Sequence, residues 1–306
     1  MTGSPKVFCF GYGYSCDYLG HDLSQQGWRV AGTTRDSGKR DILKARGIDA
    51  HLFDYERPLP DPAYILRDVT HIVISTPPGD DGDPAFLMHA QDMLQLPSLQ
   101  WVGYLSTTGV YGDRNGEWVD EDSELRPNSK RGSRRVRAEE QWLSLLKTHR
   151  LPVHVFRLAG IYGPGRSALD TIRAGVARRI DKPGHAFSRI HVEDIARVLI
   201  ASMGKPNPGA VYNLCDDLAV PSHEVIAHAC ELLARPVPPL IPFDEADMSP
   251  MARSFYADNK RVKNDRIKRE LGVDLKYKNY IDGLQACLDA EEYALSIFDG
   301  SKQLQT

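Results

Sequence analysis

Residues 6–16 read KVFCFGYGYSC, an apolar run that passes through two glycines into a helical pattern. Lys6–Gly11 predicts a buried strand, and Tyr14–Gln26, with Leu19 and Leu23 four residues apart, predicts a helix. A strand that turns through glycines into a helix brings backbone N–H groups and the positive end of the helix dipole to one point. That arrangement suits the pyrophosphate of a dinucleotide. A tight turn without a ligand is the alternative.

Outward from this segment, apolar runs alternate with helical patterns through the first half of the chain, which is typical of βαβ units and a parallel sheet. Gly/Pro-rich turns break the second half into short pieces and favour a smaller lobe. The predicted fold class is therefore α/β. The further predicted strands are 28–33, 51–53, 70–76, 100–106 and 153–158, and the further predicted helices are 41–46, 137–148, 192–202, 222–233 and 280–294.

Composition excludes several classes of protein. Hydrophobic residues make up 42% of the 306 residues and charged residues 26%, so a disordered, collagenous or coiled-coil chain is excluded. The formal charge of −3 gives no overall field that favours nucleic acid or an anionic membrane. We therefore expect a small-molecule substrate rather than a nucleic acid or a membrane as the partner.

The cysteines and the N-terminus bear on localisation. Five cysteines are widely spaced and form no CxxC pair, so neither a disulfide framework nor a zinc site is indicated. The N-terminal apolar run is too short for a signal peptide, and no run reaches the ~18 residues of a membrane span. We expect a cytoplasmic protein without a metal.

Several residues are candidates for holding a nucleotide cofactor. Strand 28–33 is followed by Thr34 and Arg35, where an acidic residue would bind a ribose 2′-hydroxyl; an arginine suits a 2′-phosphate instead, so NADP is preferred over NAD. A solvated surface arginine is the alternative. Asp54 could bind the adenine amino group or cap a turn. The cofactor-binding candidates are Gly11, Tyr12, Gly13, Tyr14, Ser15, Cys16, Thr34, Arg35, Asp54, Ser75, Thr76 and Pro77.

Three hydroxyl residues, Ser106, Thr107 and Thr108, follow one another at the end of the predicted strand 100–106. The carboxyl ends of parallel strands form the edge where open α/β sheets bind ligands. A hydroxyl there can hydrogen-bond a substrate carbonyl, although serine and threonine at such places also cap helices. Ser106 and Thr107 are candidate catalytic residues, and Thr108 is a candidate substrate-binding residue.

Five segments, taken in order, resemble the extended short-chain dehydrogenases/reductases, the NAD(P)-dependent epimerase/dehydratase superfamily. They are LSTTGVYG (105–112), RLAGIYGPGR (157–166), RIHVEDIA (189–196), VYNL (211–214) and RVKNDRIKRELG (261–272). The resemblance covers nearly the whole chain. It implies a Rossmann-type, doubly wound parallel sheet that holds a nicotinamide cofactor, and a smaller C-terminal lobe that binds substrate. It also allows a homodimer formed through a two-helix face.

The resemblance divides the chain into two interleaved parts. It implies an NAD(P)-binding Rossmann domain over residues 1–163, with returning segments at about 189–216. The smaller substrate-binding lobe would then span residues 164–306.

The chain departs from the family where catalysis is expected. By resemblance Thr107 is the catalytic Ser/Thr position, but Arg131 and Arg135 stand where the family has the tyrosine and lysine of YxxxK. A guanidinium stays protonated, so it cannot exchange a proton as a phenol does, but it can stabilise an oxyanion. Arg131 and Arg135 are therefore candidate catalytic residues within a positive cluster at 130–137. A solvated helix start or a nucleic-acid patch are the alternatives.

Two further segments leave roles open. By resemblance, sugar-nucleotide members carry a substrate-binding asparagine at the position of Gly160, and glycine cannot supply that contact. Tyr162 and His191 are candidate substrate residues, with a structural tyrosine and a hydrogen-bonded loop histidine as the alternatives. The sequence thus predicts an NADP-dependent oxidoreductase or epimerase-like enzyme with an atypical site, acting on a small, anionic hydroxyl or carbonyl compound. A catalytically inactive NADP(H)-binding sensor is the alternative.

Overall fold

The computed structural model describes residues 3–303, with the side chains at 251 and 292–303 left out of the description. Seven strands form one parallel sheet. In spatial order they are β11 (Val211–Leu214), β7 (Val153–Leu158), β5 (Trp101–Thr107), β4 (His71–Ile74), β1 (Lys6–Phe10), β2 (Arg29–Thr34) and β3 (Asp49–Leu52). The predicted α/β class and Rossmann-type sheet are confirmed.

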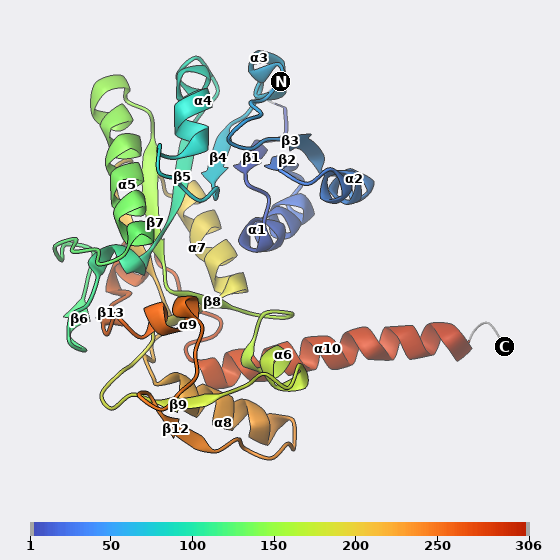
Figure 1. Cartoon of the computed structure of the whole chain (residues 1–306). Helices are drawn as coiled ribbons and strands as arrows, with labels where there is room; N and C mark the ends of the chain where they lie inside the picture. The colour runs from blue at the N-terminus through green and yellow to red at the C-terminus, as the bar shows by residue number, and fades with distance from the viewer. Residues whose placement is uncertain (1–2, 304–306) are drawn as a thin grey trace.

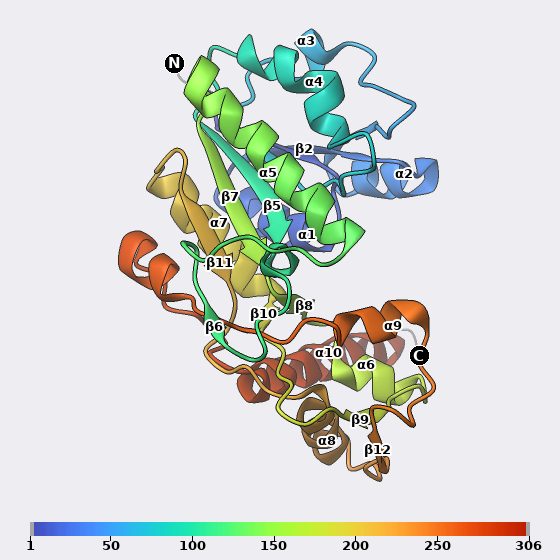
Figure 2. The same cartoon turned by 60° about the vertical axis from the view of Figure 1, so that its left-hand side comes forward.

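The sheet is covered on both faces, which is why its strands are nearly continuous apolar runs (Figures 1 and 2). One apolar cluster joins the sheet to α1 and α7 and reaches α2, and the other joins it to α3, α4 and α5. The bounds of these helices are α1 (Tyr14–Gln25), α2 (Ser37–Ala45), α3 (Pro62–Ile65), α4 (Pro84–Leu94), α5 (Lys130–His149) and α7 (Val192–Gly204).

The remaining elements form a smaller lobe below the carboxyl edge of the sheet (Figure 1). Its apolar cluster contains Tyr162, Leu169 and Leu284. Three short parallel pairs supplement it: β8 with β10, β9 with β12, and β6 with β13. The bounds are β6 (Trp118–Val119), β8 (Gly160–Tyr162), α6 (Ala168–Arg173), β9 (Arg179–Asp181), β10 (Arg189–His191), α8 (Ser222–Leu232), β12 (Leu240–Pro242), α9 (Pro250–Phe255), β13 (Arg261–Val262) and α10 (Tyr280–Gln303).

The chain returns to the sheet after entering the small lobe, because β11 pairs with β7 although β9 and β10 precede it. The predicted division at residue 163 stays a prediction. All five cysteines are free thiols and are buried. Within the described residues no helix combines the length and apolarity needed to cross a bilayer.

Two helices differ from the prediction. Helix α5 begins at Lys130, seven residues before its predicted start, because the Ser129 side chain accepts a hydrogen bond from Gly132 N and caps the helix. Helix α4 was not predicted at all. It begins at Pro84, and Asp83 caps it by accepting from Ala85 N and Phe86 N.

Candidate active site

The turn after β1 can be made only by glycine. Gly11 has φ +84°, and a Cβ there would lie 3.1 Å from Thr76 N and 3.2 Å from Thr76 Cγ2. Its own N–H donates to Thr33 Oγ1 at 2.8 Å. The left-handed backbone and the close approach of the chain after β4 both exclude a side chain here. Gly11 therefore packs the β1 turn directly against the ends of β2 and β4.

The N-terminus of α1 is open. Gly13 is the residue that precedes the helix, no side chain caps the first turn, and the nearest neighbour of a Cβ at Gly13 would be 3.9 Å away. The uncapped N–H groups and the helix dipole attract an anion. Beside Gly11, Thr76 Oγ1 is buried and has no hydrogen-bond partner in the described part of the chain. An open helix start next to an unpaired hydroxyl fits a phosphate-bearing group.

The side chains of the glycine segment point away from that opening. Tyr12 and Cys16 are 2% and 1% exposed and belong to the apolar core beneath the loop, so only their backbone faces the opening. Tyr14 OH donates to Pro164 O at 2.9 Å and so joins the loop to the small lobe. Ser15 is buried in the first turn of α1.

On the β4 side, the backbone continues the sheet. Ser75 N donates to Phe10 O at 2.8 Å. Pro77 is exposed, and its carbonyl accepts a hydrogen bond from Tyr55 OH at 2.8 Å. The structure thus brings Ser75 and Thr76 to the glycine loop and leaves the ring of Pro77 facing solvent.

The ends of β2 and β3 carry the predicted ribose contacts. Thr34 Oγ1 accepts from Asp36 N at 3.3 Å, whereas the Arg35 side chain is exposed at the strand end. Asp54 accepts from Glu56 N at 3.0 Å and pairs with Arg57 at 2.6 Å, which lowers the pKa of its carboxyl. Asp54 therefore has the turn-capping contacts that were weighed against adenine binding.

The hydroxyls at the end of β5 differ in their contacts. Ser106 donates to Glu139, and Glu139 forms a buried ion pair with Arg157 at 2.8 Å. Thr107 is half-buried and accepts from Gly109 N at 3.1 Å, which caps the 3-10 turn Thr108–Tyr111. Thr108 is also half-buried, at the start of that turn. Thr107 and Thr108 are thus more accessible than Ser106, which is buried.

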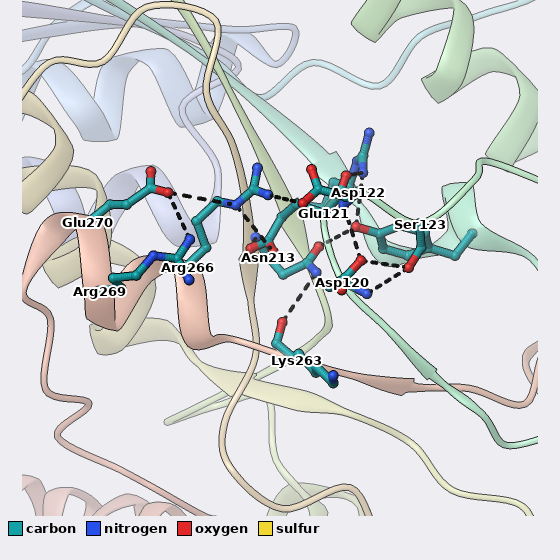
Figure 3. A network of polar contacts seen from close by, with 11 residues as sticks. Asp120, Glu121, Asp122, Ser123, Asn213, Lys263, Arg266, Arg269 and Glu270 are labelled. Atoms are coloured by element: carbon teal, nitrogen blue, oxygen red, sulfur yellow. Dashed lines mark hydrogen bonds and ion pairs between the residues drawn. The ribbon is translucent and has the colours of Figure 1, made fainter.

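A buried polar network continues from this ion pair. Arg157 donates to Tyr111 OH at 2.9 Å, Tyr111 OH donates to Asn213 Oδ1 at 2.7 Å, and Asn213 N donates to Glu121 Oε1 at 2.8 Å. Glu121 in turn lies 3.7 Å from Arg266 Nε (Figure 3). Burial raises the pKa of Tyr111 to about 12, so its phenol holds its proton and fixes the network.

Residues 113–122, between β5 and α5, contact residues 259–266 of the C-terminal segment. Asn259 N donates to Asp113 Oδ1 at 2.8 Å, β6 pairs with β13, and Arg266 pairs with Asp122 at 2.7 Å. Figure 3 shows the part of this contact that is formed by residues 120–123 and residues 263–270.

The arginines in the first turns of α5 make different contacts. Arg135 donates to Leu105 O at 2.6 Å and to Tyr104 OH at 3.1 Å, so it is bound to the end of β5. Arg134 pairs with Asp80, and Arg137 donates to Asp80 O at 3.0 Å. Arg131 stays exposed, 5.9 Å from the ring of Phe255 in the small lobe. Of the two predicted catalytic arginines, only Arg131 has its guanidinium free of hydrogen bonds to β5.

Comparison with known proteins agrees with this fold. The profile of the NAD dependent epimerase/dehydratase family matches residues 92–215. A functionally unknown conserved protein from Silicibacter pomeroyi DSS is 51% identical, with 94% of this chain and 99% of that chain covered and a TM-score of 0.87. The chain belongs to the NAD dependent epimerase/dehydratase family. None of the curated proteins compared matches it.

More distant solved structures share the fold of this epimerase/dehydratase family member. dTDP-glucose 4,6-dehydratase from Bacillus anthracis str. Ames, in complex with NAD, is 18% identical, with 95% and 97% of the two chains covered and a TM-score of 0.71. UDP-glucuronic acid 4-epimerase from Bacillus cereus, in complex with NAD, is 16% identical, with 93% and 97% covered and a TM-score of 0.72.

Tyr162 and His191, the two remaining candidate substrate residues of this epimerase/dehydratase family member, form hydrogen bonds within the protein. Tyr162 OH donates to Asn279 O at 3.3 Å. His191 Nδ1 accepts from Glu193 N at 3.3 Å and so caps α7, and burial lowers the pKa of His191 to about 4. A neutral, capping histidine is not poised to exchange protons near neutral pH.

Arg189 was not predicted from the sequence as a site residue of this family member. It lies on β10, and its guanidinium donates to Phe187 O at 2.9 Å, Val220 O at 3.1 Å and Ser222 Oγ at 3.1 Å. A signal was present, because a charged residue directly precedes the apolar Ile190 in a segment that becomes a buried strand.

Proposed function

We propose that this protein is a nicotinamide-dependent oxidoreductase or epimerase-like enzyme that prefers NADP. The observation that carries the proposal is the opening formed by Gly11, Gly13 and the uncapped start of α1, with the unpaired Thr76 hydroxyl beside it. Membership of the family supports a nicotinamide cofactor, as do distant relatives whose structures contain NAD. A nicotinamide ring, when bound, donates or accepts a hydride.

Each residue then has a defined task. The backbone at Gly11 and Gly13 and the first turn of α1 hold the pyrophosphate. The exposed Arg35 binds the 2′-phosphate that distinguishes NADP from NAD. Thr107 donates a hydrogen bond to the substrate oxygen, and the exposed Arg131 offsets negative charge that develops on that oxygen or on an anionic substrate. The substrate is a small hydroxyl or carbonyl compound.

A second candidate function is a catalytically inactive NADP(H) sensor. The observation that favours it is the pair of arginines at the family's tyrosine and lysine positions. Arg135 is bound to Leu105 O and Tyr104 OH, and the guanidinium of Arg131 cannot act as the general acid and base that a tyrosine phenol provides. In this case the fold binds the cofactor and signals its redox state without turnover.

Calorimetric titration with NAD⁺, NADH, NADP⁺ and NADPH tests the proposal. We expect the NADP forms to bind more tightly, and Arg35→Asp to shift the preference towards NAD. Arg40→Asp is the matched control, because Arg40 lies on α2 beyond the strand end and pairs with Asp41. An unchanged preference in Arg35→Asp contradicts the 2′-phosphate role, and failure of all four forms to bind contradicts the proposal.

Turnover separates the two candidate functions. NADPH oxidation is followed with a panel of carbonyl compounds that includes aldehydes, keto acids and sugars, and NADP⁺ reduction with the matching alcohols. Consumption of any substrate that is reduced by Thr107→Val supports the enzyme. Cofactor binding that differs between NADP⁺ and NADPH, without any turnover, supports the sensor.

A further inference from the structure

A pocket of about 190 Å³ lies in the small lobe between α6, α8 and α10. Val225, Ile226 and Leu284 form the apolar wall of its lining. The lining also carries hydroxyls and two positive charges, which come from Tyr162, Arg166, Thr171, Arg189, Ser222 and Tyr280. An apolar pocket with a few convergent polar groups is the usual form of a small-molecule site.

Arg189 is the charged group that the pocket encloses. Its guanidinium donates to two backbone carbonyls and to Ser222 Oγ, all of them neutral acceptors. Arg189 is half-buried, and within the described residues it has no carboxylate at ion-pair distance, whereas the buried Arg157 has Glu139 at 2.8 Å. A partly buried cation without a counter-ion is available to an oxyanion, which binds it through charge-assisted hydrogen bonds.

The acidic residue near Arg189 does not replace that counter-ion. Asp216 N donates to Arg189 O at 2.6 Å, and one carboxylate oxygen of Asp216 is buried without a partner in the described part of the chain. Burial raises the pKa of Asp216 to about 7, so its carboxyl is partly protonated at neutral pH. It therefore neutralises Arg189 only in part.

Gly160 places this arginine beside the expected substrate. Gly160 is paired with Arg189 across β8 and β10, and a Cβ at Gly160 would lie 3.8 Å from Arg189 Cγ. The sugar-nucleotide relatives carry a substrate-binding asparagine at this position, as the resemblance implies. In this chain the amide is missing, and the aliphatic part of the Arg189 side chain lies next to Gly160.

We propose that the pocket around Arg189 binds an oxyanion, a phosphate or a carboxylate, at one end of the substrate. The inference rests on the proposed function, because it places this end of the substrate next to the family's cleft. A pocket of about 190 Å³ is smaller than the ~300–1,000 Å³ of a typical ligand site, so it takes only the end of a molecule. Arg166 and Tyr280 supply further donors, and the apolar wall suits carbon atoms next to the charged group.

Methyl phosphate and benzoate serve as probes of the two oxyanion classes, and their binding is measured by ligand-detected NMR and calorimetry without cofactor. Arg189→Gln removes the charge, and Ala168→Phe fills the pocket from α6 without touching a hydrogen bond of Arg189. Arg179→Gln is the matched control. Arg179 also donates to two carbonyls of the small lobe, those of His223 and Pro238, but it does not line the pocket.

We expect at least one probe to bind the unmodified protein, and both pocket variants to weaken it by about tenfold or more. Arg179→Gln should leave the affinity unchanged. The probe that binds more tightly identifies the substrate end as a phosphate or a carboxylate. Failure of both probes to bind, or equal binding by all four proteins, overturns the proposal. Ala168→Phe keeps the test valid if Arg189→Gln does not fold.

The cofactor titration separates this inference from the proposed function. Arg189→Gln and Ala168→Phe should bind NADP⁺ like the unmodified protein, because the substituted residues lie on β10 and α6 and the first turn of α1 does not line the pocket. If the nicotinamide forms do not bind but the probes bind through Arg189, the proposed function is wrong and the oxyanion pocket stands. If NADP⁺ binds and neither probe does, the pocket proposal alone is wrong.

Discussion

Two corners of the same sheet edge are built in opposite ways. At the glycine corner, formed by residues 11–16 and Thr76, no side chain caps the first turn of α1, and the Thr76 hydroxyl has no partner in the described part of the chain. At the arginine corner, formed by Ser106, Arg135 and Glu139, the polar groups are bonded to one another or to β5. Uncapped and unpaired groups are available to a ligand, whereas paired groups stabilise the fold. We therefore propose binding for the first corner and support of the fold for the second.

The largest effect on stability is expected from breaking the buried ion pair between Glu139 and Arg157 at the arginine corner. Glu139→Ala leaves Arg157 buried without its carboxylate, which should lower the free energy of unfolding by about 3–5 kcal/mol. Urea denaturation measures it. The double variant Glu139→Leu with Arg157→Met should recover most of the loss, since it removes both charges. A loss below about 1 kcal/mol in Glu139→Ala would mean that this corner does not support the fold.

Near the arginine corner, Asp83 is a buried carboxyl that is only partly paired. Burial raises the pKa of Asp83 to about 6, and its Oδ2 has no partner in the described region. A carboxyl with a raised folded pKa contributes stability at low pH and loses it as pH rises from 3.8 through about 6. Asp83→Asn should therefore gain stability relative to the unmodified protein over that range, by up to about 3 kcal/mol. Asparagine still caps α4.

Thermal or urea unfolding at several pH values measures this difference. Asp36→Asn is the control, because Asp36 also caps a helix by accepting from Lys39 N but lies at an exposed site. A difference between Asp83→Asn and the unmodified protein that does not change with pH contradicts the burial argument.

The glycine corner is tested by comparing two glycines with similar backbones. Gly11 and Gly27 have φ +84° and +79°, but only Gly11 has neighbours close to the missing side chain. Alanine at either position should cost about 1–2 kcal/mol of backbone strain, and Gly11→Ala should cost more because of Thr76. Gly11→Ala should also weaken cofactor binding, which Gly27→Ala should leave intact. Equal effects on stability and binding would contradict the close contact with Thr76.

The smallest effect is expected for Arg135→Lys, which restores the residue type found in the family. One guanidinium nitrogen donates to both Leu105 O and Tyr104 OH, and the ring of Tyr104 lies 5.6 Å from the guanidinium carbon. Lysine lacks the planar group, so we expect a loss of about 1 kcal/mol. Arg134→Lys, in an exposed ion pair with Asp80, should change stability by less than about 0.5 kcal/mol. A loss no larger than that control would show that the contacts of Arg135 contribute little.

Six of the seven strands of the sheet were predictable, because burial on both faces requires continuous apolar runs, whereas β11 (Val211–Leu214) was not predicted as a strand. Val153–Leu158 is the predicted range itself, and β1 differs from the prediction only by Gly11. The start of α5 was not predictable in the same way. Arginine-rich residues 130–137 include Gly132, whose Cβ would lie 2.8 Å from Pro127 Cβ, so a tertiary contact selects the glycine. The local sequence pattern alone therefore did not locate the start of the helix.

The candidate site shows the same difference between features that are local in sequence and contacts between distant residues. The glycine corner was predictable, because strand, glycines and helix are adjacent in sequence. The partners of Arg135 lie 30 and 31 positions away in Leu105 and Tyr104, and a local pattern contains no trace of them. The pocket around Arg189 combines residues from α6, α8, β10 and α10, so its position follows only from the packing of the small lobe.

The tie between residues 112–123 and the C-terminal segment has a consequence for synthesis on the ribosome. Asp122 and Arg266 are 144 residues apart. At ~5–20 residues per second, the partner of Asp122 emerges roughly 7–30 s later. The glycine corner can form early, from the first hundred residues, but β6 waits for β13. Translation therefore completes this tie last, and a chain that stops before residue 259 has the glycine corner but lacks the Asn259–Asp113 contact.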